Sequence, residues 1–302
     1  MPVTAITLVC NPEADALDDA LVDEATHRLL DAAGDVDIMR RTLADSVAED
    51  FLIDGTIGRA DVETALSDLL ADAPVDIIVQ PAATRLKRLL IADMDSTIIG
   101  QECIDELADF AGLKGEISAI TERAMRGELD FAAALTARVG MLKGLPETAL
   151  DECFRSRISL NPGAQTLVRT MNAIGATTVL VSGGFTFFVE RIARLAGFQL
   201  HQANELLIEN GALTGQVRLP ILGREAKEAA LRRHARSKSI PLAETLAVGD
   251  GANDLDMIAA AGLGVAYRAK PKVAAAADAS IGHADLTALL FAQGLSRSEF
   301  AE

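Results

Sequence analysis

The sequence predicts an α/β protein: a doubly wound parallel sheet with a helical cap inserted after its first strand, preceded by a small α+β domain. The chain has 302 residues and is half hydrophobic, which is enough to bury cores for about two domains. From Leu86 onward, short apolar runs ending in small or acidic residues alternate with helical patterns, which favours a parallel sheet. Helical patterning fills Glu102 to Phe154, too long for one crossover helix, so we expect a cap at residues 100–158.

Residues 1–82 are expected to form the small N-terminal domain. Their patterns follow the order strand, helix, strand, strand, helix, strand, over Val3–Val9, Leu17–Leu29, Val36–Leu43, Val47–Ile53, Val62–Leu70 and Val75–Val79. Gly34 ends the first helix, and Pro74 and Pro81 bound the last strand. This order is the ferredoxin-like arrangement and resembles an ACT-type regulatory domain. It contains no ligand motif, so a docking or dimerisation role, giving a homodimer, is the alternative.

The second domain, residues 83–302, takes its strands from four apolar runs, Leu89–Asp93, Thr177–Gly184, Thr245–Gly251 and Gly262–Tyr267. Residues Glu205–Leu219 predict a hairpin that turns at Asn210-Gly211. Helices are predicted at Gly223–Ala235 and over the four alanines Ala274–Ala277.

Composition excludes several classes of partner. The chain has 28 Lys and Arg against 44 Asp and Glu, a formal charge of -16, which repels nucleic acid and anionic membrane surfaces. Three distant cysteines (Cys10, Cys103, Cys153) give no disulfide framework and fit a reducing compartment. The start lacks the basic and apolar regions of a signal peptide, and no apolar run is long enough to span a membrane. We therefore expect a cytoplasmic protein whose partner is a small molecule.

Two carboxylates, Asp93 and Asp95, follow the first apolar run of the second domain. In a parallel sheet, ligands bind outside the carboxyl ends of the strands. Residues two apart on extended backbone point the same way, so both side chains can face one reacting centre. Because close carboxylates repel each other, the pair needs a cation or a shared proton. On this segment alone, an ordinary acidic strand end is the alternative.

A second acidic cluster, Asp250 and Asp254, follows the apolar run Thr245–Gly249. Flanking glycines allow the backbone around Asp250 to approach a ligand closely. Carboxylate and carbonyl oxygens are the ligands that Mg²⁺ prefers, so Asp93, Asp250 and a nearby backbone carbonyl suit a magnesium site. The four histidines show no zinc-type spacing.

Two further features are compatible with phosphate binding. Ser182-Gly183-Gly184 ends a strand ahead of a helical pattern, where a hydroxyl and backbone amides can bind an anion. A plain tight turn is the alternative. Lys227 lies in a helical stretch and, viewed alone, is an ordinary surface lysine. P-loop, serine-hydrolase elbow and dinucleotide fingerprints are absent from the sequence.

The order of these motifs resembles the haloacid dehalogenase superfamily. Asp93–Thr97 matches its DxDx[TV] motif, Ser182 its strand-end serine or threonine, Lys227 its lysine, and Asp250 with Asp254 its acidic pair. The likeness covers most of the chain. It implies a core sheet of the haloacid dehalogenase type.

Within that superfamily, the run Asp93–Glu106 resembles the phosphoserine phosphatases, and Glu102 matches their carboxylate for the substrate amine. Phe131 and Arg138 match cap residues that contact the substrate in that family. Phosphoserine carries an ammonium, a carboxylate and a phosphate; Glu102 can meet the first and Arg138 can fork onto the second. Outside the motif, either charge would be an ordinary solvated helix residue.

The resemblance implies a two-step phosphoryl transfer. Asp93 would be the nucleophile, giving an aspartyl phosphate, and Asp95 the general acid and then base. Mg²⁺ would be held by Asp93, Asp250 and the backbone carbonyl of Asp95. The other residues implied to contact the substrate phosphate or support the site are Ser182, Gly183, Lys227, Asn253 and Asp254. The product would be L-serine, in the last step of its synthesis.

Two alternatives stay open at this point. The scaffold also suits a phosphotransferase or a phosphatase for another small phosphomonoester. A serine- or phosphate-sensing binding protein is a rival from another class, although a binder has no need of the nucleophile Asp93.

Overall fold

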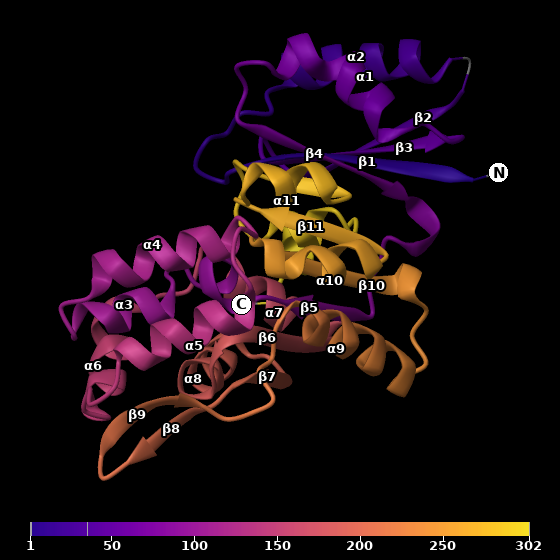
Figure 1. The fold of residues 1–302 in the computed structure, drawn as a ribbon. Coiled ribbons are helices and arrows are strands. Elements are labelled where there is room, and N and C mark those ends of the chain that lie inside the picture. The colour runs from indigo at the N-terminus through magenta and orange to yellow at the C-terminus, as the bar shows by residue number, and fades with distance from the viewer. Residues whose placement is uncertain (1, 35, 302) are drawn as a thin grey trace.

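The computed structural model describes residues 2–34 and 36–301, which form two large sheets with helices packed on them and a separate two-stranded sheet (Figure 1). The first part of the chain forms an antiparallel sheet of strand order β2-β3-β1-β4. Its elements are β1 (Val3–Cys10), α1 (Asp19–Ala33), β2 (Ile38–Ala44), β3 (Ala48–Asp54), α2 (Arg59–Leu70) and β4 (Val75–Pro81). Helices α1 and α2 lie side by side over one face of this sheet (Figure 1). The predicted ferredoxin-like order is confirmed.

Local signals explain where α1 begins and ends. The Asp18 carboxylate accepts a hydrogen bond from the Leu21 amide at 2.8 Å, which caps the first turn. Gly34 follows the last turn with φ at 81°, a left-handed conformation that glycine adopts without steric strain.

The second sheet is parallel and has the strand order β12-β11-β10-β5-β6-β7. Its strands are β5 (Leu89–Ala92), β6 (Thr177–Phe185), β7 (Leu200–Asn204), β10 (Thr245–Gly249), β11 (Leu263–Tyr267) and β12 (Ala279–Ile281). Its helices are α7 (Ala164–Ala173), α8 (Thr186–Ala196), α9 (Arg224–Ser237), α10 (Leu255–Ala260), α11 (Pro271–Ala276) and α12 (Ala288–Phe291). The predicted doubly wound sheet is confirmed.

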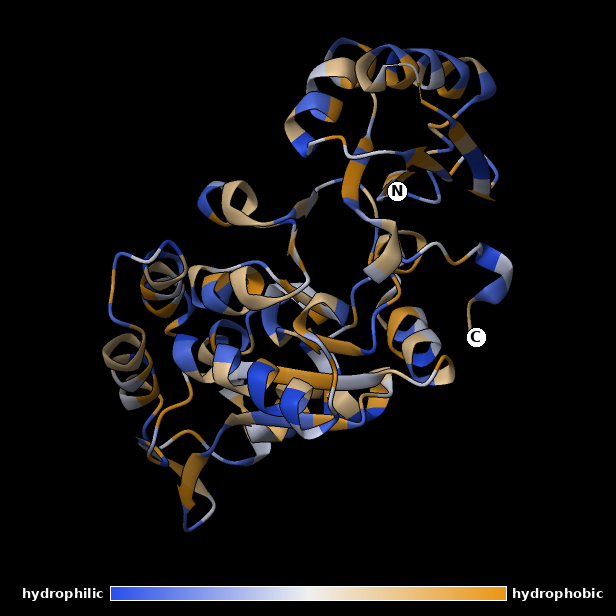
Figure 2. Ribbon diagram, turned by 90° about the vertical axis from the view of Figure 1, so that its right-hand side faces the viewer, coloured by the Kyte–Doolittle hydropathy of each residue, from blue (hydrophilic) through white to orange (hydrophobic). Residues whose placement is uncertain are grey.

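Both faces of the central strands are buried, so their sequences are continuously apolar. In β5, Leu89 and Ile91 pack into the cluster under α9, whereas Leu90 and Ala92 face the larger cluster on the other side. Figure 2 shows hydrophobic strands in the middle of this part and mixed, partly hydrophilic helices around them. No helix among residues 2–34 and 36–301 combines the length and apolar character that a membrane crossing needs.

The predicted insertion between the first two core strands is present as four helices. These are α3 (Cys103–Asp109), α4 (Lys114–Met125), α5 (Phe131–Met141) and α6 (Thr148–Arg157). The predicted hairpin is formed by β8 (Leu206–Glu209) and β9 (Ala212–Val217), with Asn210 and Gly211 at positive φ in the turn. It packs against the cap, because the Gly144 amide donates to the Leu213 carbonyl at 2.8 Å.

One local prediction differs from the structure. The strand expected to stop at Ser182–Gly184 continues to Phe185, which pairs with Asn204, and α8 begins only at Thr186. The Gly184 amide donates to the Ser182 hydroxyl at 2.8 Å and is therefore not a free donor at a helix start.

The two sheets meet through polar contacts that involve the C-terminal part of the chain. The Asp76 carboxylate in β4 accepts hydrogen bonds from the amides of Gly282, His283 and Ala284, at 2.9, 3.1 and 2.8 Å, just after β12. Gln80 donates to the Ala292 carbonyl at 2.8 Å. Strand β4 therefore lies beside the edge strand of the parallel sheet (Figure 1).

Candidate active site

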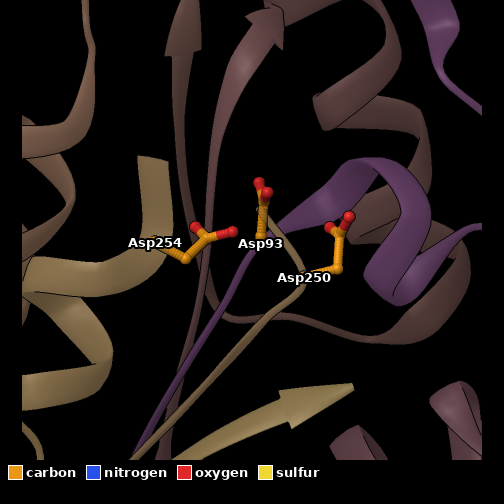
Figure 3. Close-up of side chains that lie close together, drawn as sticks. All are labelled: Asp93, Asp250 and Asp254. Carbon is orange, nitrogen blue, oxygen red and sulfur yellow. The ribbon is translucent and has the colours of Figure 1, made fainter. Parts of the chain in front are cut away.

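The carboxyl ends of β5 and β10 bring three carboxylates together. The strands are adjacent and parallel, with Ala92 opposite Val248, so Asp93 and Asp250 emerge at the same edge of the sheet. Asp254 follows one short turn later, and oxygens of all three side chains lie within 4.8 Å of one another. Figure 3 shows Asp254 and Asp250 on either side of Asp93. All three are buried.

Lys227 of α9 supplies the positive charge nearest to this cluster. Its Nζ lies 2.8 Å from Asp93 Oδ1 and 2.6 Å from Asp254 Oδ1, and the side chain is 0 % exposed. Burial disfavours the charged amine, but Asp254 and Asp93 outweigh it and raise the pKa of Lys227. One ammonium therefore faces three carboxylates.

This imbalance perturbs the acids. Burial, followed by repulsion from Asp254, holds the pKa of Asp93 well above its usual range and raises the pKa of Asp250 to about 7. A divalent cation would relieve both effects, and carboxylate oxygens are the donors that Mg²⁺ prefers. The donor set of Asp93, Asp250 and Asp254 thus fits a hard divalent cation.

Asp95 lies on the irregular turn that follows β5. Its Oδ1 accepts from the Cys103 amide at 2.8 Å, and its Oδ2 accepts from the Ser182 hydroxyl at 3.1 Å. Burial is the main cause that raises the pKa of Asp95, and these hydrogen bonds oppose it. The turn itself depends on Ser96, which has φ at 55°.

The cap adds two opposite charges to the same pocket. Glu102 accepts a 2.6 Å hydrogen bond from the Ser96 hydroxyl, and burial, then the charge of Asp95, hold its pKa well above the usual range. Arg138 is 5 % exposed and donates to Thr121 Oγ1 at 2.9 Å. Burial lowers the pKa of Arg138 against the raising effect of Glu102. The predicted residues that line this one pocket are Asp93, Asp95, Glu102, Phe131, Arg138, Gly183 and Asn253.

The remaining predicted residues adjoin the pocket. Ser182, Lys227, Asp250 and Asp254 reach it through their contacts with Asp95 and Asp93 or with each other. The Oδ1 atom of Asn253 is buried and has no hydrogen-bond partner in the described part of the chain, so it is a free acceptor beside the carboxylates.

Glycine at position 183 is required by the cap. A Cβ atom there would lie 2.5 Å from Cζ of Phe131, closer than side-chain atoms approach one another. The strand end and the cap helix α5 therefore meet across the pocket with no room for a side chain at Gly183.

Sequence reasoning missed two residues that hold the site together. Thr97 donates to Asp250 Oδ1 at 3.1 Å and is fully buried. Asn204 donates to the Gly183 carbonyl at 2.8 Å and accepts from the Leu222 amide at 2.7 Å, which ties the end of β6 to the segment before α9. The sequence offered one sign for each residue. Thr97 belongs to the first motif, and Asn204 is a polar residue at the end of a strand.

Known proteins share this arrangement. The family model described as haloacid dehalogenase-like hydrolase matches residues 90–259, more than half of the chain. The chain belongs to this hydrolase family. The matched region begins in β5 and ends in α10, so it includes every strand-end carboxylate and the cap.

Relatives within the haloacid dehalogenase-like hydrolases agree with the predicted resemblance, which is confirmed. A phosphoserine phosphatase of Mycobacterium tuberculosis is 45% identical over 240 residues, covering 79% of this chain and 58% of that protein. This chain thus spans less than two thirds of that relative's length.

Two solved structures of the same hydrolase family are similar to this fold. A family hydrolase of Salmonella enterica serovar Typhi has a TM-score of 0.81 at 30% identity and covers 96% of this chain and 97% of its own. A structure described as a phospho-aspartyl intermediate analogue of phosphoserine phosphatase has a TM-score of 0.65 at 38% identity, covering 68% of this chain and 98% of that one.

Proposed function

We propose that the chain hydrolyses O-phospho-L-serine to L-serine and phosphate with the help of Mg²⁺. The observation that carries this proposal is a single pocket lined by the strand-end pair Asp93 and Asp95 and by both cap charges, Glu102 and Arg138. A zwitterionic amino acid bearing a phosphate needs this combination of groups. The names of the relatives support the same substrate.

Each part of the substrate has a counterpart in the pocket. The ammonium pairs with Glu102, and the carboxylate accepts two hydrogen bonds from the guanidinium of Arg138. Phe131 packs against the carbon chain. The phosphate is bound by Ser182, the Gly183 amide, Lys227 and Asn253.

Mg²⁺ would be held by Asp93, Asp250 and the backbone carbonyl of Asp95, with Asp254 beside them. When bound, the ion neutralises charge on the phosphoryl oxygens, which lowers the barrier to attack by an anionic carboxylate. Asp254 keeps Lys227 in place through their 2.6 Å contact.

Asp93 carries the covalent step. One of its carboxylate oxygens forms a bond to phosphorus as the bond from phosphorus to the serine oxygen breaks, giving an aspartyl phosphate. Asp95 donates its proton to the departing serine oxygen, and its raised pKa supports a protonated state before the reaction.

Asp95 then acts as a base in the second step. As a carboxylate it takes a proton from a water molecule that attacks phosphorus, and the bond from Asp93 to phosphorus breaks to release phosphate. The phospho-aspartyl analogue reported for a relative supports the covalent route.

The rest of the chain has proposed roles as well. We place the domain boundary between residues 82 and 83, with a regulatory or dimerising role for the N-terminal domain. The reaction would serve as the final step of L-serine biosynthesis in the cytoplasm, on a free small-molecule substrate.

Phosphate release from O-phospho-L-serine by the purified chain tests the proposal. We expect turnover that stops with a strong chelator and returns with Mg²⁺, and a higher Mg²⁺ requirement in Asp250→Asn. Full turnover in the presence of chelator would contradict the proposed requirement for Mg²⁺. No phosphate release with Mg²⁺ present would overturn the proposed function.

A further inference from the structure

Arg138 is a buried cation without a carboxylate partner. It lies in α5 and is 5 % exposed, yet it forms no ion pair with any residue in the described ranges 2–34 and 36–301. Its Nε donates to the Ala134 carbonyl in its own helix at 3.2 Å, and its Nη1 donates to Thr121 Oγ1 at 2.9 Å. The guanidinium has five N–H donors and lines the pocket, so three of them make no hydrogen bond with the described residues and stay available to a ligand.

Thr121 of α4 links Arg138 to an acid on a third cap helix. The Thr121 hydroxyl lies 2.6 Å from Oδ1 of Asp105 in α3 and 3.1 Å from the Ile117 carbonyl. A hydroxyl has a single proton, and the shorter contact with a carboxylate takes it. With its proton committed to Asp105, the Thr121 oxygen turns a lone pair toward Arg138.

The hydroxyl between the two charges matters for what Arg138 can bind. A carboxylate in direct contact would neutralise the guanidinium and occupy the paired N–H donors that an incoming carboxylate needs. Thr121 instead fixes one N–H while the charge stays available to a ligand. Glu102, the opposite charge of the pocket, is likewise held by a hydroxyl, that of Ser96 at 2.6 Å.

We propose that Thr121, backed by Asp105, is a positioning residue that holds Arg138 for the substrate carboxylate. The pair thereby sets the preference for phosphomonoesters that carry an α-carboxylate. This inference rests on the proposed function and extends it to Thr121, which lines the pocket beside Arg138, and to Asp105 behind it.

Two substrates isolate the effect, O-phospho-L-serine and phosphoethanolamine, which keeps the amine and the phosphate but lacks the carboxylate. Thr121→Val preserves the shape of the side chain and removes the hydroxyl. We expect its kcat/KM for phosphoserine to fall about 10-fold or more, mainly through a higher KM, because a buried hydrogen bond to a charged group is lost. For phosphoethanolamine the change should stay within about 2-fold.

Four further variants give the test its controls. Thr121→Ser restores the hydroxyl and should recover most of the selectivity, whereas Asp105→Asn should lose part of it. Thr136→Val removes an exposed hydroxyl from α5 that bonds only its own helix at Ala132, so it should behave as the unaltered chain. Arg138→Ala removes the guanidinium itself, so it gives the largest loss of kcat/KM for phosphoserine, relative to phosphoethanolamine, that this contact can cause.

The outcomes separate this inference from the proposed function. Arg138→Ala is expected to lower kcat/KM for phosphoserine much more than for phosphoethanolamine. If it does so, but Thr121→Val lowers kcat/KM equally for both substrates or for neither, the positioning role is overturned and the proposed function stands. A Thr121→Val loss that Thr121→Ser does not recover overturns it as well. If the unaltered chain releases no phosphate from phosphoserine, the proposed function fails and the inference fails with it.

Discussion

For the single residues of the site, the main feature is an excess of buried negative charge. Asp93, Asp250 and Asp254 are buried together, and the one ammonium beside them, that of Lys227, contacts Asp93 and Asp254. Burial and mutual repulsion raise the pKa of Asp93 and Asp250, so the cluster is poised to exchange protons for a cation. The cap adds one further charge of each sign, Glu102 and Arg138, which match the two ends of an amino acid.

Arg138→Ala tests the carboxylate end of the pocket. Losing a bidentate hydrogen bond to a charged group should raise the free-energy barrier for phosphoserine by about 1.5–3 kcal/mol, seen as a lower kcat/KM. Phosphoethanolamine should suffer much less. Arg126→Ala is the matched control, because that arginine pairs with Glu122 and Glu128 on the cap surface. Equal losses on both substrates would mean that Arg138 supports the fold or the phosphate.

Glu102 should make recognition of the amine dependent on pH. Its pKa is raised by burial and by Asp95, so on acidification it becomes protonated earlier than an ordinary glutamate. An ammonium needs the charged form, so kcat/KM for phosphoserine should fall relative to that for 3-phosphooxypropanoate, which lacks the amine.

We expect this ratio to fall on acidification, and to begin falling at a higher pH than an ordinary glutamate would give, because burial and Asp95 raise the pKa of Glu102. Ionisation of the phosphate affects both substrates and cancels in the ratio. In Glu102→Gln the ratio should be low and flat. A flat ratio in the unaltered chain would show that Glu102 does not bind the amine in its charged form.

The sequence predicted which functional residues stand at the strand ends. It did not predict which distant residues form hydrogen bonds with the residues of the site. Asp93, Asp250 and Lys227 stand out because each follows a recognisable strand or lies in a motif. Thr97, Asn204 and Thr121 act through contacts with residues distant in the chain, at Asp250, Gly183 and Arg138. No local pattern marks a threonine whose hydroxyl reaches across two helices.

At the scale of elements, the site depends on the fit between β6 and the cap. Gly183, near the end of β6, lies so close to Phe131 at the start of α5 that a Cβ atom on the strand would meet the ring at 2.5 Å and displace it. The sequence predicted both elements from their apolar periods. It placed the strand end one residue early, at Gly184, because the glycines that usually stop a strand here continue it as far as Phe185.

Gly183→Ala should therefore lower the free energy of unfolding by about 1–3 kcal/mol, the range for overpacking a filled site. Adding Phe131→Ala should recover part of that loss, because it removes the ring that the new methyl group meets. Gly140→Ala is the control, since a Cβ there meets nothing within 4 Å. Additive losses in the double variant, measured by chemical denaturation, would contradict the steric explanation.

At the scale of the whole molecule, the N-terminal sheet is joined to the core by buried polar groups. Asp76 accepts from three consecutive amides after β12, and Asp50 of β3 pairs with Arg85 at 2.9 Å in the segment that leads into β5. The sequence predicted two domains and their order, but an acid in a strand carries no sign of which distant amides it will meet.

Asp76→Ala should destabilise this junction. Removing the acceptor leaves three amides near the domain contact unpaired, which costs about 1–3 kcal/mol. The unfolding midpoint should fall. Phosphoserine turnover at low temperature should persist, because the Asp76 contact follows the edge strand β12, which two strands separate from β5 and its Asp93. Asp72→Ala, at an exposed position nearby, should leave the midpoint unchanged. Equal midpoints for both variants would show that the contact contributes nothing.

In the proposed reaction Asp93 is the nucleophile, and Asp95 is the proton donor and then the base. Asp95→Asn keeps the nucleophile but cannot activate water, and general acid–base help is typically worth about 10²–10⁴-fold. Incubating this variant with phosphate-labelled nitrophenyl phosphate, whose leaving group needs little protonation, and mapping the label tests the claim most directly. We predict labelled protein with the phosphate on Asp93, and none in Asp93→Asn. Label on Ser96 or Ser182, or labelled protein in Asp93→Asn, would contradict this assignment of roles.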